Sequence, residues 1–404
     1  MPADIIVGMQ FGDEGKGKVV DLLAEKYDAI VRYGGGSNAG HTVYVDDESL
    51  VLHLVPSGIL HKGKSNVLGD GMVIDLSVLA SEIKGLKEKG WLNGNLYISD
   101  RAHITLPHYY PIEEEEEKDL KIGTTRKAIG PTYTFMADRI GIRLCDLPDE
   151  TVLRERLLLN LQKSRRLLPE GYEPDVDYLI RQILQDSEGI AEYIADTSFL
   201  INRWLVEGQN VLFEGAQGTH LDLIHGTYPY VTSSYPTAGG ALIGAGVGPT
   251  TIREVLGVVK SYTTRVGGGA FPTELHDETG NHIREKAHEY GATTGRPRRC
   301  GWLDMVMLRY AKRINGAGEI ALTRLDILDG IDPLRVCVGY ELDRSFVDEK
   351  DAPFPASESV LYRSKPVYRE LPGWHASTFG VTDYSKLPDN TKRYVACIED
   401  NLDL

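Results

Sequence analysis

The sequence predicts an α/β fold built on a large, mostly parallel central sheet with flanking helices and a phosphate-binding loop. Three observations favour this fold. Residues 4–7 form a short apolar run that ends in a glycine-rich turn, a helical pattern follows at residues 19–27, and a second apolar run at residues 29–33 leads into another glycine cluster. A strand, a glycine turn and a helix in this order are typical of a doubly wound sheet, in which ligands bind at the carboxyl ends of the strands.

The remaining elements follow from apolar runs and helical spacing. Further buried strands are predicted at residues 66–68, 96–98, 211–213, 256–259, 320–322 and 336–338. Helices are predicted at residues 77–87, 151–168, 175–205 and 305–314. Five consecutive glutamates at residues 113–117 predict a solvated helix face or loop, because like charges repel one another. Without an internal repeat or a Pro/Ser-rich linker, we expect a single domain over residues 1–404, with helical insertions at about 150–205.

Composition narrows the class of protein. With 59 acidic and 44 basic side chains the net charge is −15, which argues against a protein that binds the nucleic-acid backbone. No apolar run approaches the ~20 residues that cross a bilayer, and the first residues lack a signal-peptide pattern. The four cysteines are far apart, which excludes a zinc ribbon or a dense disulfide framework. We therefore expect a cytoplasmic protein with neither a nucleic-acid nor a membrane partner.

The sharpest motif runs from Gly12 to Lys18 and has the phosphate-loop spacing Gly-x4-Gly-Lys between a strand and a helix. Glycines let backbone N–H groups approach phosphate oxygens, and the helix N-terminus favours the same anion. Val19 stands where a Ser or Thr usually ligates Mg²⁺, and Asp13 and Glu14 place carboxylates inside the loop. A carboxylate there repels phosphate unless it binds a metal or takes a proton. The alternative is a plain turn.

Two further turns follow predicted strands. In residues 37–42, Ser-Asn-Ala-Gly-His-Thr, His41 is either an ordinary surface histidine or a cation that neutralises charge on a leaving phosphoryl group. In residues 214–219, Glu-Gly-Ala-Gln-Gly-Thr, the Gln217 amide can hydrogen-bond both a ring nitrogen and an exocyclic oxygen of a purine. A plain turn amide is the other interpretation of Gln217.

Two motifs lie in the second half of the chain. Residues 293–299, Thr-Thr-Gly-Arg-Pro-Arg-Arg, contain three arginines in four positions, which predicts a receptor for carboxylates or phosphate, or else a solvated basic loop. Residues 323–326, Thr-Arg-Leu-Asp, follow a predicted strand and resemble the element of GTP enzymes whose aspartate reads guanine. An aspartate after a strand is also common in ordinary turns.

Taken in order, the segments GDEGKGK, NAGHT, FEGAQGT, HGTYPYVTSS, TRVGGGAFPTE, TTGRPRR with GWLD, and LDILDG resemble the adenylosuccinate synthetase family over nearly the whole chain. The resemblance implies ligation of IMP and L-aspartate to adenylosuccinate through 6-phosphoryl-IMP, with GTP as co-substrate and Mg²⁺ as cofactor. This is the first committed step from IMP to AMP. It also implies a homodimer in which Arg139 reaches IMP of the neighbouring subunit.

The resemblance assigns residues one by one. Asp13 matches the general base that removes the N1 proton of IMP, His41 the acid that stabilises charge during phosphoryl transfer, and Gln217 the residue that holds the purine. Asp13 and the Gly40 carbonyl match the Mg²⁺ ligands. The implied IMP site comprises Asp13, Glu14, Gly15, Lys16, Asn38, Ala39, Gly40, His41, Thr125, Arg139, Gln217, Thr232 and Arg296. The implied aspartate site comprises Ala292, Thr293, Thr294, Gly295, Arg296 and Arg298. The implied GTP site comprises Gly12, Asp13, Glu14, Gly15, Lys16, Gly17, Lys18, Gly40, His41, Thr42, Arg298, Arg324, Leu325 and Asp326.

Three features depart from the family pattern. Arg126 and Ala128 replace two glycines of the IMP-phosphate loop. We therefore do not expect the backbone of this loop to be identical to that of the family. Arg324 replaces a lysine that packs on guanine, and an arginine can stack there as well. The sequence ends at Leu404, so we expect the family's usual C-terminal guanine-contacting segment to be absent after 404. Two other functions stay open: a phage-type relative that ligates dGMP and aspartate, and a non-catalytic GTP-binding protein, although intact Asp13, His41 and Gln217 favour the ligase.

Overall fold

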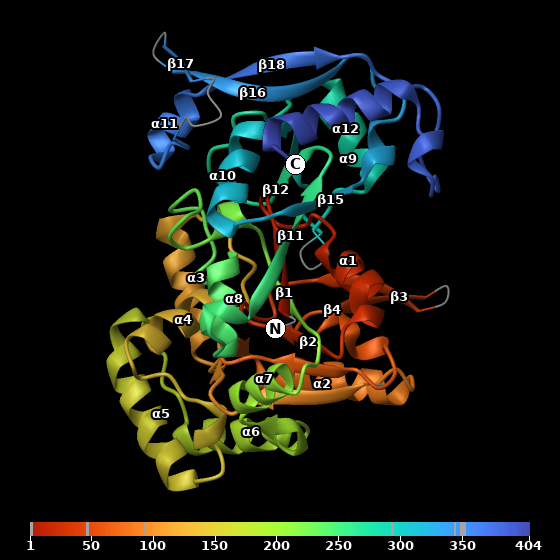
Figure 1. Cartoon of the computed structure of the whole chain (residues 1–404). Coiled ribbons are helices and arrows are strands. Elements are labelled where there is room, and N and C mark those ends of the chain that lie inside the picture. Colours follow the sequence, from red (N-terminus) through yellow and green to blue (C-terminus); the bar gives the residue numbers. More distant parts are fainter. Residues whose placement is uncertain (1–2, 46–47, 93, 292–294, 343–344, 348–352) are drawn as a thin grey trace. The chain divides into compact units, whose positions relative to one another are not determined.

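The central element is an eight-stranded sheet with the order β15-β11-β1-β10-β2-β5-β7-β9. Strands β1, β2, β11 and β15 of this sheet are labelled in Figure 1. The computed structural model describes residues 3–45, 48–92, 94–291, 295–342, 345–347 and 353–404. The sheet comprises β1 (Ala3–Gly8), β2 (Ala29–Arg32), β5 (Ser65–Leu68), β7 (Asn95–Ser99), β9 (Ile194–Ala195), β10 (Val211–Glu214), β11 (Ile252–Lys260) and β15 (Glu319–Thr323). Strands run parallel in the pairs β1–β10, β10–β2, β2–β5, β5–β7, β7–β9 and β11–β15. The predicted parallel α/β sheet is confirmed.

The inner strands β1, β2 and β10 are mostly apolar. Every residue of β1, β2 and β10 is buried, as expected for parallel strands covered by helices on both sides. Two of these strands carry a charged residue at their carboxyl end, Arg32 in β2 and Glu214 in β10, and both side chains are fully buried. Because buried charges need partners, these strand ends are candidate positions for a functional site.

The chain divides into two compact units, of which the first comprises residues 1–6, 16–216 and 232–254. Its helices are α1 (Lys16–Leu23), α2 (Leu76–Glu88), α3 (Tyr109–Leu120), α4 (Ile129–Ala137), α5 (Glu150–Ser164), α6 (Val176–Glu188), α7 (Thr197–Val206) and α8 (Ala238–Ala245). It also holds the antiparallel pair β3 (His41–Val45) and β4 (Glu48–Leu52), and the short parallel pair β6 (Val73–Ile74) and β8 (His103–Ile104). The helix predicted over residues 175–205 is in fact two helices separated by β9. Helix α6 ends at Glu188, and Asp196 caps α7 by accepting from Phe199 N at 3.0 Å.

The second unit comprises residues 7–15, 217–231 and 255–404. Its helices are α9 (Glu278–Ala287), α10 (Met305–Asn315), α11 (Glu358–Arg363) and α12 (Asp389–Leu402). Its smaller sheets pair β12 (Thr263–Arg265) with β13 (Arg299–Gly301), and join β14 (Leu303–Asp304), β16 (Leu334–Leu342), β17 (Ser345–Val347) and β18 (Lys365–Leu371). Residues 336–338 are therefore a strand as predicted, but β16 lies outside the central sheet and pairs antiparallel with β17 and β18. In the described part of the chain, no helix combines the length and apolarity needed to cross a bilayer.

Candidate active site

The predicted phosphate loop packs tightly against the turn that carries Gln217. A Cβ placed on Gly8 would lie 2.6 Å from the Gln217 carbonyl oxygen, and one on Gly218 would lie 2.5 Å from Gly12 N. Both positions therefore require glycine. Asp13 (φ 61°) and Gln217 (φ 55°) adopt the left-handed conformation that is uncommon for residues with a side chain. Such strain gathers at functional sites, which fits the roles predicted for both residues.

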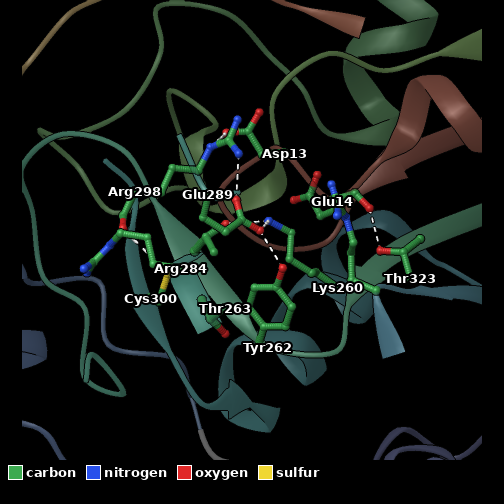
Figure 2. A network of polar contacts seen from close by, with 12 residues as sticks. Asp13, Glu14, Lys260, Tyr262, Thr263, Arg284, Glu289, Arg298, Cys300 and Thr323 are labelled. Atoms are coloured by element: carbon green, nitrogen blue, oxygen red, sulfur yellow. Dashed lines mark hydrogen bonds and ion pairs between the residues drawn. The ribbon is translucent and has the colours of Figure 1, made fainter. Parts of the chain in front are cut away.

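Glu14 shapes this loop from within. Its side chain is buried, and Oε1 accepts from Gln10 N at 3.0 Å and from Gly12 N at 2.9 Å. The Glu14 carbonyl accepts from Thr323 Oγ1 at 2.6 Å (Figure 2). One of the two loop carboxylates is thus used to fold the turn, which leaves Asp13 as the loop carboxylate that can meet a ligand.

Asp13 is paired with the predicted aspartate receptor. Its side chain is 40% exposed, and Oδ2 lies 2.7 Å from Arg298 Nε (Figure 2). The Arg298 guanidinium also donates from its NH1 group to Glu289 Oε2 at 2.6 Å. Two residues that lie far apart in the sequence, one predicted to be the base and the other to bind a carboxylate, are therefore in direct contact within the second unit.

His41 is anchored in the first unit by a buried carboxylate. Its Nδ1 lies 2.5 Å from Glu214 Oε1, and Glu214 also accepts from Ser57 N at 2.9 Å and Ser57 Oγ at 2.6 Å. The pKa of His41 lies below its ordinary value, because burial and the nearby cations Arg32 and Lys16 outweigh the opposing effect of Glu214. Burial raises the pKa of Glu214, but His41 and Arg32 hold it below its ordinary value. Glu214 therefore acts as an ionised anchor on Nδ1, which leaves Nε2 as the ring nitrogen that can reach a ligand.

His41 also contacts the start of α1. A Cβ placed on Gly17 would lie 2.8 Å from His41 Cβ, so this position too has no room for a side chain. Lys16, the first residue of α1, is 4% exposed and lowers the pKa of His41. The imidazole thus lies against the helix N-terminus that the phosphate-loop motif predicts to bind an anion.

The loop that is predicted to bind the IMP phosphate has a glycine-like backbone at both substituted positions. Arg126 (φ 56°) and Ala128 (φ 54°) both take the left-handed conformation that glycine adopts without cost. Glu113 holds this loop, because its Oε2 accepts from Ala128 N at 2.7 Å, and Glu117 Oε1 accepts from Gly123 N at 2.6 Å. The expectation that the whole run of five glutamates is solvated is therefore wrong for Glu113, which is 6% exposed. Its hydrogen bond to the loop stabilises it there.

Four other residues predicted to bind IMP belong to the first unit: Asn38, Thr125, Arg139 and Thr232. Arg139 is exposed and left-handed (φ 66°) on the turn after α4. Asn38 Oδ1 accepts from Gly36 N at 3.2 Å. Thr125 and Thr232 are half-buried.

The predicted aspartate and guanine residues belong to the second unit. Ala292, Thr293 and Thr294 lie outside the described residues. Gly295 is left-handed (φ 64°), and Arg296 accepts at its carbonyl from Gly291 N at 2.8 Å. In the predicted guanine element, Arg324 is exposed and left-handed (φ 60°), and Leu325 and Asp326 open the short turn that follows it.

Three side chains of these networks escaped sequence reasoning: Glu214, Glu289 and Glu113. Glu214 had a signal, since a carboxylate at the end of the apolar run 211–213 is costly unless it is paired. Glu289 had none, because it follows a polar helix and its partners Lys260 and Arg298 lie 29 and 9 residues away. Glu113 was hidden inside a run of identical residues.

The Asp13 carboxylate is a suitable ligand for Mg²⁺. Mg²⁺ favours one or two carboxylates together with substrate phosphates and water over an all-protein cage. Asp13 presents a partly exposed carboxylate on the phosphate loop. In the described ranges, no cluster of three or more His, Cys, Asp or Glu side chains could enclose a metal.

An α/β sheet whose first strand leads into a phosphate-loop motif is typical of nucleotide-binding proteins. The family model for adenylosuccinate synthetase matches residues 5–404. The chain belongs to the adenylosuccinate synthetase family, which consists of GTP-dependent ligases that form a C–N bond.

Similar proteins agree over the full length. Adenylosuccinate synthetase of Thermodesulfovibrio yellowstonii is 52% identical over 406 residues, covering 100% of this chain and 95% of that protein. The enzyme of Carboxydothermus hydrogenoformans is 51% identical, covering 99% and 94%. The fully ligated adenylosuccinate synthetase from Plasmodium falciparum superposes with a TM-score of 0.93 at 39% identity, covering 100% of this chain and 96% of that one. Cyanophage S-2L succinoaminodeoxyadenylate synthetase, bound to dGMP and dATP, shares only the fold, with a TM-score of 0.58 at 22% identity over 80% of this chain and 84% of that one.

Proposed function

We propose that this chain ligates IMP and L-aspartate to adenylosuccinate while cleaving GTP to GDP and phosphate, in the cytoplasm. Family membership supports the reaction. The observation that carries it for this chain is the contact between Asp13 and Arg298, 2.7 Å apart, which joins a carboxylate on the phosphate loop to an arginine that suits a carboxylate substrate.

The first chemical step activates the purine. The Asp13 carboxylate removes the N1 proton of IMP, and the 6-oxygen attacks the γ-phosphorus of GTP, which gives 6-phosphoryl-IMP and GDP. His41 neutralises the charge that develops on the phosphoryl group, because Glu214 orients its ring and supports its charged form. Gln217 holds the purine through its amide. Bound Mg²⁺, held by Asp13 and the Gly40 carbonyl, would supply charge neutralisation at the phosphates.

The second step forms the C–N bond. The amine of aspartate attacks carbon 6 of the activated purine, phosphate leaves with the original 6-oxygen, and the amine proton is released. Arg298 and Arg296 hold the carboxylates of aspartate so that its amine faces the ring. Because Arg298 is paired with Asp13 in this structure, it must exchange that partner for the substrate carboxylate before the base can act.

The active form is a homodimer in which Arg139 serves the IMP site of the other subunit. The exposed, left-handed Arg139 on the turn after α4 is consistent with a side chain that acts outside its own chain. Mixing inactive Arg139→Leu with inactive Asp13→Ala protein tests this arrangement, because each mixed dimer regains one intact site. We expect partial recovery of turnover in the mixture. No recovery would show that each site is complete within one chain.

The reaction itself is tested by ultraviolet absorbance with aspartate and Mg²⁺, crossing IMP or dGMP with GTP or ATP. We expect turnover only with IMP and GTP, and a loss of several orders of magnitude in kcat for Asp13→Asn with folding retained. Turnover with dGMP would transfer the chain to the phage-type specificity. Nucleotide binding without ligation in any combination would favour a GTP-binding protein without catalytic activity.

A further inference from the structure

Glu289 is the buried centre of the polar network around Arg298. Its side chain is 1% exposed and accepts three hydrogen bonds, from Arg298 NH1 at 2.6 Å, Lys260 Nζ at 2.8 Å and Tyr262 Oη at 2.6 Å (Figure 2). Lys260 is the last residue of β11 and is equally buried, at 1% exposure. A buried carboxylate that accepts hydrogen bonds from three donors is restrained to one position.

The backbone of Glu289 fixes the backbone of Arg298 as well. Arg298 N donates to the Glu289 carbonyl at 2.8 Å, and Arg284 Nε donates to the Arg298 carbonyl at 2.9 Å. Gly291 N donates to the Arg296 carbonyl at 2.8 Å one step further along. Glu289 therefore constrains both the main chain and the side chain of Arg298.

The charges of the network leave one positive charge for a ligand. Lys260 and Arg298 are cations and Glu289 is an anion, so these three groups carry a net charge of +1. Burial raises the pKa of Glu289, but Lys260 and Arg298 together lower it to about 2, so it stays ionised. In this structure Asp13 supplies the balancing negative charge at Arg298 Nε. The carboxylate of a bound aspartate supplies the same balancing negative charge to Arg298 once Asp13 leaves it to act as the base.

We propose that Glu289 is the positioning residue of the aspartate receptor. It accepts a hydrogen bond from Arg298 NH1 on the buried side of the guanidinium. The Nε side of the guanidinium therefore faces Asp13 in this structure and faces the substrate carboxylate when aspartate binds. Lys260 and Tyr262 hold the Glu289 carboxylate in place. Glu289 itself contacts no substrate. This inference rests on the proposed ligation of aspartate and adds to it the residue through which Arg298 is set.

The principal test is Glu289→Gln, with Glu285→Gln as the matched control. Glu285 is an exposed carboxylate on α9 that accepts from Tyr290 Oη at 2.6 Å and does not contact Arg298, so its change removes the same charge nearby without touching the receptor. We expect Glu289→Gln to raise the KM for aspartate by roughly 10- to 100-fold, as expected when a clamp loses its geometry. The KM for IMP should stay within about threefold, and Glu285→Gln should match the wild type.

Calorimetric titration of aspartate, with IMP and a non-hydrolysable GTP analogue present, separates positioning from folding. We expect Glu289→Gln to weaken binding by at least about tenfold, but by less than about twofold when Arg298→Met is already present, because Glu289 acts through Arg298. Equal losses in both backgrounds, or a lowered Tm with unchanged aspartate affinity, would overturn the inference.

A conservative variant keeps the test open if Glu289→Gln does not fold. Glu289→Asp retains the charge but withdraws the carboxylate from Arg298, and we expect it to weaken aspartate binding severalfold. Unchanged affinity in Glu289→Asp would contradict a geometric role. A wild-type chain that binds no aspartate would instead overturn the proposed function and the receptor with it, so the two failures are distinct.

Discussion

Replacing Glu214 by glutamine tests whether His41 works as a charged group. The carboxylate accepts three hydrogen bonds with no donor of its own, from His41 Nδ1 and from the amide and hydroxyl of Ser57. A glutamine brings two N–H donors into this fully buried position. If its amide nitrogen takes the place of Oε1, Nδ1 must accept rather than donate, which opposes the imidazolium form. If the nitrogen takes the place of Oε2, it faces the amide of Ser57.

The expected loss in kcat follows from the strength of the hydrogen bond between His41 and Glu214. A hydrogen bond to a charged group contributes about 1.5–3 kcal/mol. If most of this stabilises His41 only as charge develops on the phosphoryl group, the loss converts to roughly 10- to 150-fold in kcat, at about 1.4 kcal/mol per factor of ten. The effect on GTP affinity should be smaller, because the phosphate loop and α1 are unchanged.

Steady-state kinetics at saturating IMP, aspartate and GTP give kcat, and thermal unfolding confirms that the variant is folded. Ser57→Ala is the matched control, since it removes one hydrogen bond to the same oxygen, 2.6 Å long, without changing the charge. We expect it to lower kcat by less than about threefold. A folded Glu214→Gln variant whose kcat lies within threefold of the wild type would show that His41 does not need Glu214 as a charged partner.

Three further predictions concern stability and the IMP loop. Arg126→Gly combined with Ala128→Gly should raise the free energy of unfolding by about 1 kcal/mol, measured by denaturant titration, because both residues have a positive φ; a lower stability would contradict the strain. Glu113→Gln should raise the KM for IMP more than it lowers kcat, since Oε2 holds Ala128 N at 2.7 Å; an unchanged KM would exclude this role. Burial lowers the pKa of His108 from 6.5 to about 4, so acidification protonates the unfolded chain first and stability falls between these values. Removing this titration with His108→Gln, which can still reach Asn160, should reduce the loss of unfolding free energy between about pH 7 and about pH 5 by about 2 kcal/mol, and an identical loss in both proteins would refute it.

Most of the fold could be predicted because its strands are short apolar runs, and the segments between several of them have the residue spacing of amphipathic helices. The apolar runs at residues 4–7, 29–33 and 211–213 correspond to β1, β2 and β10 in the central sheet. The run at 336–338 has the same local character but belongs to β16 in a separate sheet. Sheet membership depends on partners distant in sequence, which a local apolar pattern does not specify.

The site residues that belong to a sequence motif could be predicted. The residues that hold them in place could not, because their partners lie elsewhere in the chain. The positive φ of Asp13 and Gln217 and their setting on turns agree with residues that glycine-rich motifs single out. Glu289 has no local signal, because its role depends on Lys260 and Arg298 being folded against it. Arg126 and Ala128 show the converse. The sequence indicates a changed loop, yet its backbone is glycine-like, and backbone amides of the loop donate to Glu113 and Glu117.

The central claim is that the purine oxygen leaves as phosphate after activation by GTP. Supplying IMP labelled with ¹⁸O at position 6, together with aspartate, GTP and Mg²⁺, and analysing the released phosphate by mass spectrometry follows that oxygen directly. We expect one ¹⁸O in each phosphate formed, matched one to one with adenylosuccinate. Unlabelled phosphate formed alongside adenylosuccinate would contradict the phosphorylated intermediate, and with it the roles proposed for Asp13 and His41.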